Sequence, residues 1–528
     1  MRRFLAALAA LGLMAVFPAG ASAAGFSLGV AAADVSSSSA ILWAHATSSG
    51  RTTLQVARSG SFGRLEKTKN VAAAKSHDNT VQSKITGLRA NTTYFYRWRQ
   101  GRKTSKVGKF KTAPAATSDT PVKFSWTGDA DAQPPKGSRA PFYNRFQVYK
   151  RQQSERNAFN VNMGDTIYSD TEVGTTNAQG VFTPAAPTAR TVAAKWAKYR
   201  QNLALANLAN LRGSGAMYNH WDDHEFINDF TKAENGSAIY NAGVKAFRDY
   251  MPVTYSSSKG IYRSFRWGKN LEVFLLDERS FRSAKASANH QCDDRNGNPD
   301  LGPTAPQSAR NTFAAIYPAL SDPPKAGCVE KINDPSRTML GSSQFTRFTN
   351  AVKSSTATFK VIMNEVPIQQ FYSLPYDRWE GYEAERRRLM DFIANNSVKN
   401  TVFLTTDVHA NLVNTIKFST LGENGPPVDT GIFDVTTGPV ATMTYHKEVS
   451  TALGSEGAAN LFRAVVLHGG PPTGVAMKCA ADDVYSYGQV SVTATALTIA
   501  LKDINGAPVK EDASIGGAQC GPYVIPKQ

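Results

Sequence analysis

Four short motifs of acidic residues and histidine stand at or near the ends of apolar runs in this chain. They are Gly128-Asp129-Ala130-Asp131, Gly164-Asp165-Thr166-Ile167-Tyr168, Trp221-Asp222-Asp223-His224-Glu225 and Asp407-Val408-His409. Three follow stretches typical of buried strands, and the Trp221 motif follows a weaker strand pattern over 216–218. Carboxylates and imidazoles at the carboxyl ends of parallel strands are the groups with which α/β proteins hold metal ions. The pattern therefore predicts a metal-dependent hydrolase.

The motif over 221–225 is the most specific of the four, because four consecutive ionisable residues between apolar flanks are seldom only a surface patch. A carboxylate beside an imidazole supplies a metal ligand and a proton donor or phosphate contact. Strand alternation turns Asp407 and His409 to the same side. Taken alone, the two Gly-Asp motifs would more often be turn aspartates. All four motifs agree in their order along the chain and in their placement at strand ends, and this agreement favours one shared site.

Metal-assisted hydrolysis of phosphate esters uses two cations a few ångströms apart, a bridging carboxylate and an activated hydroxide. It needs no serine nucleophile. The sequence contains neither a Gly-x-Ser-x-Gly elbow nor a phosphate-binding loop of the nucleotide-binding type. A metal-activated hydroxide is therefore the attacking group that the sequence favours.

The chain is long and basic. Its 528 residues predict two or more domains, and its formal net charge of +17 favours anionic partners such as phosphates and anionic lipid surfaces. Lysine and arginine are scattered, apart from Arg386-Arg387-Arg388, which falls in a helical pattern over 382–393 and is expected to be a solvated face. We therefore predict no dedicated nucleic-acid binding.

Residues 1–23 have the features of a signal peptide: Arg2 and Arg3, an apolar run over 4–17 and a small-residue cleavage site at 21–23. The arginine pair leaves twin-arginine export and ordinary secretion both open, so the protein is expected to be periplasmic or secreted. No later stretch is long and apolar enough for a transmembrane helix.

The four cysteines allow three pairings, of which we favour Cys292–Cys328 and Cys479–Cys520, because each would cross-link a segment rich in Gly, Pro or Asn.

The chain divides into regions by pattern. Residues 24–115 alternate apolar and polar residues in short runs, as in a β-sandwich, and a linker over 113–121 follows. From 122 to 528 strand and helix patterns alternate, with one helical stripe over 194–211. Residues 283–337 have the composition of a long insertion, expected to be functional or stapled by its cysteines. The end over 516–528 reads as a loop.

The chain resembles the alkaline phosphatase D (PhoD-like) family of metallophosphoesterases. The matching segments are Gly-Asp-Thr-Ile-Tyr-Ser-Asp (164–170), Trp-Asp-Asp-His-Glu (221–225), Leu-Leu-Asp-Glu-Arg-Ser-Phe-Arg (275–282), Arg-Thr-Met-Leu-Gly-Ser-Ser-Gln (337–344), Trp-Glu-Gly-Tyr (379–382) and Thr-Asp-Val-His-Ala (406–410). The resemblance implies an α/β fold, namely a four-layer α/β/β/α metallophosphoesterase core preceded by a fibronectin III-like β-sandwich. It further implies export and metal-dependent hydrolysis of phosphomonoesters and phosphodiesters, with iron and calcium as the suspected ions.

The resemblance also assigns roles to the metal-site residues. Asp165 would bridge the metals, Tyr168 would bind an iron-like ion, and Asp407 and His409 would complete the cluster. Asp223 would hold the second metal, at a position where related phosphoesterases often have an asparagine.

His224 would be the proton donor or phosphate contact, so that it forms the catalytic group together with Asp165 and Asp223. Arg279 and Asn364 are further candidates for the pocket. Arg279 follows a strand-end aspartate, and its alternative is a structural ion pair.

In one respect the chain departs from the family pattern. Members often carry a cysteine ligand at the end of the first catalytic strand, whereas this chain has Asp129 and Asp131 there. Either aspartate would give a site of oxygen and nitrogen ligands only, which leaves the metal identity open.

The predicted function is thus an exported metal-dependent phosphoesterase, a monomer acting on small phosphate esters. Two alternatives remain: a phospholipase D-type phosphodiesterase acting on phospholipid headgroups, and a cell-surface binding protein whose catalytic domain is degenerate. The natural substrate and the preference for monoesters or diesters are not determined by the sequence.

Overall fold

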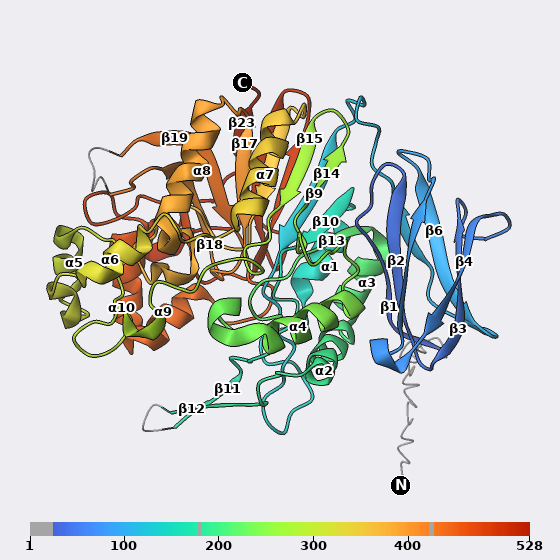
Figure 1. Cartoon of the computed structure of the whole chain (residues 1–528), viewed down its shortest axis with the longest axis horizontal. Coiled ribbons are helices and arrows are strands. Elements are labelled where there is room, and N and C mark those ends of the chain that lie inside the picture. Colours follow the sequence, from blue (N-terminus) through green and yellow to red (C-terminus); the bar gives the residue numbers. More distant parts are fainter. Residues whose placement is uncertain (1–24, 178–180, 422–426) are drawn as a thin grey trace, which may run out of the picture.

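The computed structural model describes residues 25–177, 181–421 and 427–528. The predicted signal peptide lies outside these ranges. In the described part of the chain, no helix combines the length and hydropathy needed to cross a membrane. Two large β-sheets and the helices that cover them make up most of the molecule (Figure 1).

A nine-stranded sheet combines strands of the N-terminal region with strands that follow residue 121. Its strands, in spatial order, are β23 (Tyr523–Pro526), β22 (Ala496–Asp503), β21 (Ser486–Val492), β9 (Val122–Thr127), β10 (Phe159–Asn162), β13 (Ala216–Asn219), β1 (Phe26–Ala33), β2 (Ser39–Ala46) and β5 (Thr80–Thr86). Strands β9, β10 and β13 are parallel, and β1 joins β13 in parallel through Ala32–Ala216. The inner sheet of the β-sandwich is therefore an extension of the sheet that contains β9, β10 and β13.

The outer sheet of the sandwich contains β3 (Gly50–Ala57), β4 (Leu65–Ala73), β6 (Thr93–Gln100), β7 (Lys103–Thr104) and β8 (Gly108–Lys111). The corner before β6 has the fibronectin-like form: Leu88 is buried, and the Tyr94 hydroxyl accepts the Arg89 backbone N–H at 2.9 Å. This agrees with the β-sandwich predicted for the N-terminal region.

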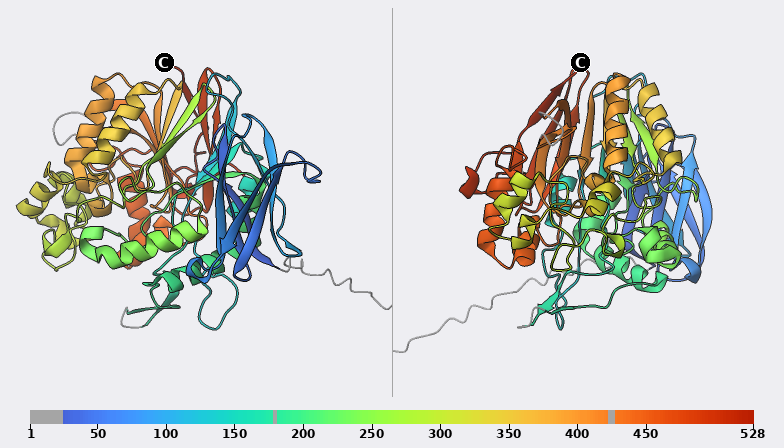
Figure 2. Two further views of the ribbon diagram at one scale, coloured as in Figure 1. Left: turned by 45° about the vertical axis from the view of Figure 1, so that its right-hand side comes forward. Right: turned by 60° about the vertical axis from the view of Figure 1, so that its left-hand side comes forward.

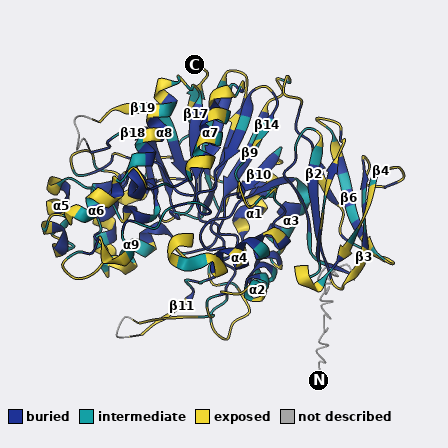
Figure 3. Ribbon diagram, viewed as in Figure 1, coloured by how far each residue is buried: buried dark blue, intermediate teal, exposed yellow. Residues whose placement is uncertain are grey.

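The second large sheet has seven strands. In spatial order they are β14 (Arg263–Trp267), β15 (Leu271–Leu275), β16 (Phe359–Met363), β17 (Thr401–Thr405), β19 (Asp429–Thr436), β18 (Asn411–Lys417) and β20 (Cys479–Ala481). Every residue of β16 and β17 is buried (Figure 3). A parallel strand covered on both faces is apolar throughout, which explains the continuous apolar runs in the sequence.

The two sheets pack face to face and helices cover their outer faces, which gives four layers. Phe124 and Val161 of the first sheet share one core with Val361 and Leu404 of the second. The nine-stranded sheet is covered by α1 (Gln147–Ser154), α2 (Val192–Leu203), α3 (Ala206–Ser214) and α4 (Lys232–Tyr250). Helices α7 (Ser342–Ser354) and α8 (Glu383–Asn395) cover the other sheet (Figures 1 and 2). The α/β/β/α core is confirmed.

The segment over 283–337 forms short helices, α5 (Gln307–Phe313) and α6 (Ala326–Ile332), which lie beside α9 (Tyr445–Leu453) and α10 (Glu456–Phe462) (Figures 1 and 2). Disulfides join Cys292 to Cys328 and Cys479 to Cys520, as predicted. The first of them staples the segment.

Three local predictions are wrong. The helical stripe over 194–211 is two helices, because Leu205 adopts an extended backbone between α2 and α3. Part of the predicted C-terminal loop is β23, which pairs with β22. Arg386 does not lie on a solvated face: helical spacing places it on the same buried side of α8 as Leu389 and Ile393, where it donates to the carbonyl oxygens of Ile368 and Lys417.

Candidate metal centre

The carboxyl ends of β9, β10, β13 and β17 bring the four predicted motifs to one place. Each chain segment turns sharply after its strand. Asp129, Asp165, Asp407 and His409 all have left-handed backbones, with φ between 47° and 69°. Non-glycine residues rarely adopt this conformation, and it concentrates at functional sites. The turns carry the side chains of Asp165, Asp407 and His409 into one cleft, and Asp129 is buried beside Asp165 and His409.

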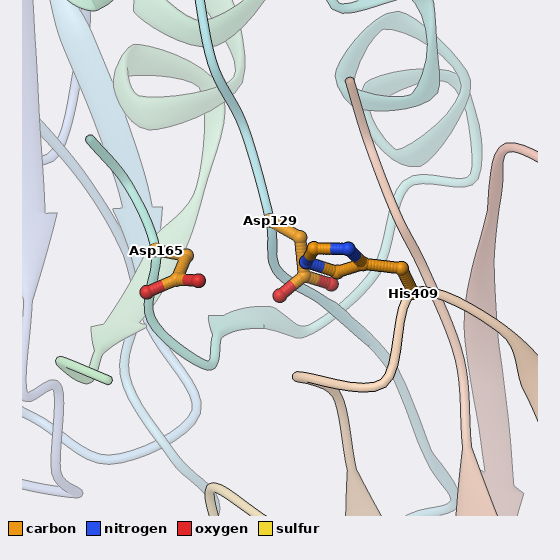
Figure 4. Close-up of side chains that lie close together, drawn as sticks. All are labelled: Asp129, Asp165 and His409. Carbon is orange, nitrogen blue, oxygen red and sulfur yellow. The ribbon is translucent and has the colours of Figure 1, made fainter. Parts of the chain in front are cut away.

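Asp129, Asp165 and His409 form the first group of potential ligands. One ligand atom from each lies within 4.8 Å of the others, and all three residues are buried. Figure 4 shows their side chains converging from three separate segments of the chain. Two carboxylates and one imidazole at this spacing suit a single cation.

A second group lies beside the first and shares Asp165 with it. Asp165, Asp223 and His224 have ligand atoms within the same 4.8 Å limit, as do Asp222, Asp223 and Asp407. Asp165 therefore faces two adjacent positions for cations, and Asp223 joins the second position to Asp407.

Tyr168 lies between the two site histidines. Its hydroxyl is 2.8 Å from Nε2 of His409, and its ring stacks on that of His224 with a centroid separation of 4.0 Å. The phenol is buried, and burial raises its pKa well above the ordinary value for tyrosine. Its oxygen thus points to the first ligand group.

The carboxylates of this site are only partly paired. Oδ2 of Asp129, Oδ2 of Asp222 and Oδ1 of Asp223 are buried with no hydrogen-bond partner among the described residues. Burial raises the pKa of Asp129 to about 7 and holds the pKa of Asp165 and that of Asp407 well above the ordinary range. A buried unpaired carboxylate is costly. Cations would remove that cost, so the residues present fit metal ions.

Each site histidine is held through Nδ1 by a carboxylate. His224 Nδ1 lies 2.8 Å from Asp170, and His409 Nδ1 contacts Glu448 of α9. Burial lowers the pKa of both imidazoles, but the surrounding carboxylates outweigh it; the pKa of His409 rises to about 10 and that of His224 also lies above its ordinary value. These contacts fix the ring orientations and leave Nε2 for the cleft.

Comparison with known proteins agrees with this architecture. The family model for PhoD-like phosphatases matches residues 136–466, more than half of the chain, and the model for the N-terminal domain of that family matches residues 13–114. The chain belongs to the PhoD-like phosphatase family. Asp129 and Asp131 lie between the two matched ranges.

Individual relatives are distant. Alkaline phosphatase D of Bacillus subtilis (strain 168) is 26% identical over 426 residues, which cover 73% of this chain and 64% of the Bacillus protein, slightly less than two thirds of its length. A solved structure of PhoD superposes with a TM-score of 0.70 at 21% identity and covers 96% of this chain and 91% of PhoD. A purple acid phosphatase from yellow lupin superposes with a TM-score of 0.55 at 10% identity, over 92% and 73% of the two chains. Both structures share the fold of this PhoD-like chain.

Asp131, predicted as an alternative ligand at the first motif, points elsewhere. Its carboxylate accepts from the Thr171 hydroxyl and from the Gln133 backbone N–H, and it belongs to none of the ligand groups formed by described residues. The left-handed turn at Asp129 breaks the alternation that would have put both aspartates on one side.

Arg279 and Asn364 are buried beneath the cleft. The Arg279 guanidinium forms ion pairs with three carboxylates, those of Asp222 at 2.5 Å, Asp377 at 2.7 Å and Asp407 at 3.2 Å. The Asn364 amide donates to the Val366 carbonyl, and its oxygen is buried without a partner among the described residues. Arg279 therefore holds site carboxylates and is not among the residues that line the cleft.

Four acidic residues near the site were not predicted: Glu172, Asp229, Asp377 and Glu448. Asp377 lies two residues before the Trp379 motif, which could have directed attention to it. Glu448 lies on α9, and Glu172 and Asp229 lie in loops beyond the motifs, so no strand-end pattern marks them.

Proposed function

We propose that this protein is an exported, metal-dependent phosphoesterase that hydrolyses phosphomonoesters, phosphodiesters or both. The observation that carries the proposal is Asp165, which belongs to two adjacent ligand groups on the wall of one cleft. A carboxylate shared by two cation positions is the arrangement that two-metal phosphoryl chemistry requires. Membership of the PhoD-like family supports the same class of substrate.

The proposed ligand sets follow the geometry. Asp129, Asp165, Tyr168 and His409 would hold one cation, and Asp165, Asp223 and Asp407 would hold the other. When bound, the two cations would supply charge neutralisation at phosphorus and a water of lowered pKa. Hard oxygen ligands with a single imidazole favour hard cations, and we propose iron at the Tyr168 position and calcium at the other.

The chain's own groups position and protonate the substrate. His224 lines the cleft with its Nδ1 held by Asp170, so its remaining nitrogen is placed to donate a proton to the leaving oxygen. Arg279 is a positioning residue in this proposal, because it acts through Asp222 and Asp407. The signal peptide and the two disulfides support an oxidising compartment outside the cytoplasm.

Asp165→Asn tests the proposal. Protein purified without chelator should contain about two or more metal ions per chain and hydrolyse p-nitrophenyl phosphate or its bis-ester, with activity lost to chelator and restored by metal. The Asn variant should lose metal and turnover while its circular dichroism is unchanged. Asp131→Asn is the matched control, since Asp131 is equally buried but lies outside the ligand groups. Full activity in Asp165→Asn would refute the bridging role.

The same preparation separates the alternatives. Folded wild-type protein that binds no metal and hydrolyses neither ester would support a binding protein with a degenerate catalytic domain. Hydrolysis of the bis-ester with little turnover of the monoester would favour a phosphodiesterase.

A further inference from the structure

An apolar cavity lies next to the metal cleft. It lies between the stapled segment over 283–337 and helices α9 and α10, and its volume is about 100 Å³. Its wall is mainly aliphatic and aromatic, with Leu301, Ala309, Phe313, Leu320, Phe462 and Val466 among its members. A cavity of this size is several times the roughly 10–15 Å³ that one water molecule needs.

Two polar side chains in the wall, those of Arg310 and Tyr317, are already engaged within the protein. The Arg310 guanidinium pairs with Asp300 at 2.8 Å and donates to the Asp322 carbonyl at 2.6 Å. The Tyr317 hydroxyl donates to Asp294 at 2.6 Å. The wall surface that remains for a ligand in this cavity is therefore chiefly hydrocarbon, so the cavity favours an apolar ligand.

The cavity and the metal cleft are contiguous. Ser373, Leu374, Val449 and Ala452 line both. Leu374 stands at this boundary with 43% of its surface exposed and a left-handed backbone, φ 44°. A bulky non-glycine residue in that conformation is strained, and such strain persists mainly at functional sites. An exposed leucine held there forms an apolar edge between the two compartments.

We propose that the cavity binds the hydrocarbon chain of an amphiphilic phosphate ester whose phosphate lies in the metal cleft. The substrate class is thus an ester of phosphoric acid that carries an alkyl or acyl chain. This inference rests on the proposed phosphoesterase function and adds to it the group that confers specificity. The acidic, cation-binding cleft and the apolar cavity beside it match the two ends of such a molecule.

A series of p-nitrophenyl alkyl phosphates, with methyl, butyl and octyl chains, tests the proposal on the metal-loaded full chain. Each methylene transferred into the cavity should lower KM about two- to fourfold, so the octyl ester should have a KM at least about tenfold below that of the butyl ester. If neither these diesters nor p-nitrophenyl phosphate were hydrolysed, the phosphoesterase function itself would be refuted, whereas hydrolysis of p-nitrophenyl phosphate alone would refute the proposed substrate class. Hydrolysis of all three with equal KM would refute the cavity's role alone.

Two variants locate the effect. Leu374→Asn introduces a residue that tolerates the left-handed backbone, and it replaces the apolar edge with an amide. Ala452→Trp obstructs the boundary from an exposed position of α9. Each should raise KM for the octyl ester at least about tenfold more than for the methyl ester. Leu461→Asn is the matched control, because Leu461 is also 43% exposed but lines neither compartment.

Binding without turnover gives an independent readout. Calorimetry should show octyl phosphate binding at least about tenfold more tightly than inorganic phosphate to wild type and to Leu461→Asn, and this difference should disappear in Leu374→Asn. Octanoate, which carries the chain without the phosphate, should bind more weakly than octyl phosphate. Equal binding of octyl phosphate by the Leu374 and Leu461 variants would overturn the proposal.

Discussion

At the scale of single residues, the two site histidines follow one rule: a carboxylate binds Nδ1 and leaves Nε2 for the cleft. Asp170 does this for His224 and Glu448 does it for His409. Such partners fix the tautomer and raise the basicity of a metal-binding imidazole. Glu448 comes from α9, so a helix 39 residues further along the chain determines how the imidazole of His409 is oriented.

Glu448→Gln should weaken metal binding without unfolding the protein. The amide preserves the shape of the side chain but removes the charge that orients His409, so metal affinity should fall about 10- to 100-fold. Metal content after dialysis against graded chelator measures the change. Glu456→Gln is the matched control: Glu456 also pairs with a histidine, His446 at 2.7 Å, but away from the cleft. Equal metal retention by both variants would rule out the orienting role.

At the scale of elements, the stapled segment over 283–337 connects the disulfide to the substrate site. It contributes Lys285 and Pro299 to the metal cleft and Leu301 to the apolar cavity. Few regular hydrogen-bonded elements hold this segment, since α5 and α6 have seven residues each. The cross-link between Cys292 and Cys328 is therefore a main constraint on the wall that both compartments share.

Replacing both Cys292 and Cys328 with serine should loosen this wall. The cysteines are 36 residues apart, and closing a loop of that length is worth about 4 kcal/mol. We expect faster amide hydrogen exchange over 283–337 and a raised KM for long-chain esters, with kcat changed less than about threefold because the metal ligands lie outside the segment. Exchange is measured by mass spectrometry.

The second disulfide provides the control for that experiment. Cys479 and Cys520 are 41 residues apart, so their removal has a similar entropic effect, but they tie β20 to the C-terminal segment. Their double serine variant should leave exchange over 283–337 unchanged. If both double variants affected KM alike, general destabilisation would be the cause.

Sequence patterns predicted the strands whose residues are buried on both faces. Strands β16 and β17 are buried throughout, so their apolar runs and the motif after β17 were recognisable. The nine-stranded sheet was not predicted to continue into the sandwich, because pairing between β1 and β13 involves residues 184 positions apart that carry no pairing pattern.

The remaining differences arise from backbone turns and from tertiary contacts. Asp131 was grouped with Asp129 by spacing, but the left-handed residue at 129 separates the two side chains. Glu448 lies on a surface helix with ordinary amphipathic character, and only the packing of α9 brings it to His409. Local sequence does not encode either feature.

At the scale of the whole molecule, the charge distribution is strongly uneven. The chain carries a formal net charge of +17, yet its buried metal centre is acidic. Under the proposed function, a basic exterior would attract anionic phosphate esters over a distance, and the acidic centre would receive them only with cations bound. Charge would then couple substrate attraction to metal loading.

The buried acidic groups also predict how pH affects the stability of the metal-free protein. Burial raises the pKa of Asp129, of Glu225 and of Glu278 to about 7 each, compared with about 4 in an unfolded chain. The folded form thus binds more protons than the unfolded form between these values. The contribution that these three groups make to the stability of the folded form is complete below about pH 4 and is lost as pH rises through about 7.

Chelated protein should therefore melt at a lower temperature at pH 8 than at pH 5, and added metal should restore the melting temperature most strongly at pH 8, since cations bind the ionised carboxylates. Asp434, whose pKa burial also raises to about 7, adds to the trend, whereas His220 and Lys195 oppose it over part of this range, because burial lowers their pKa to about 3 and to about 7. Scanning calorimetry at both pH values, with and without metal, measures the effect. A metal-free protein that became more stable towards pH 8 would contradict this prediction and would show that other groups of the chain already offset these buried carboxylates.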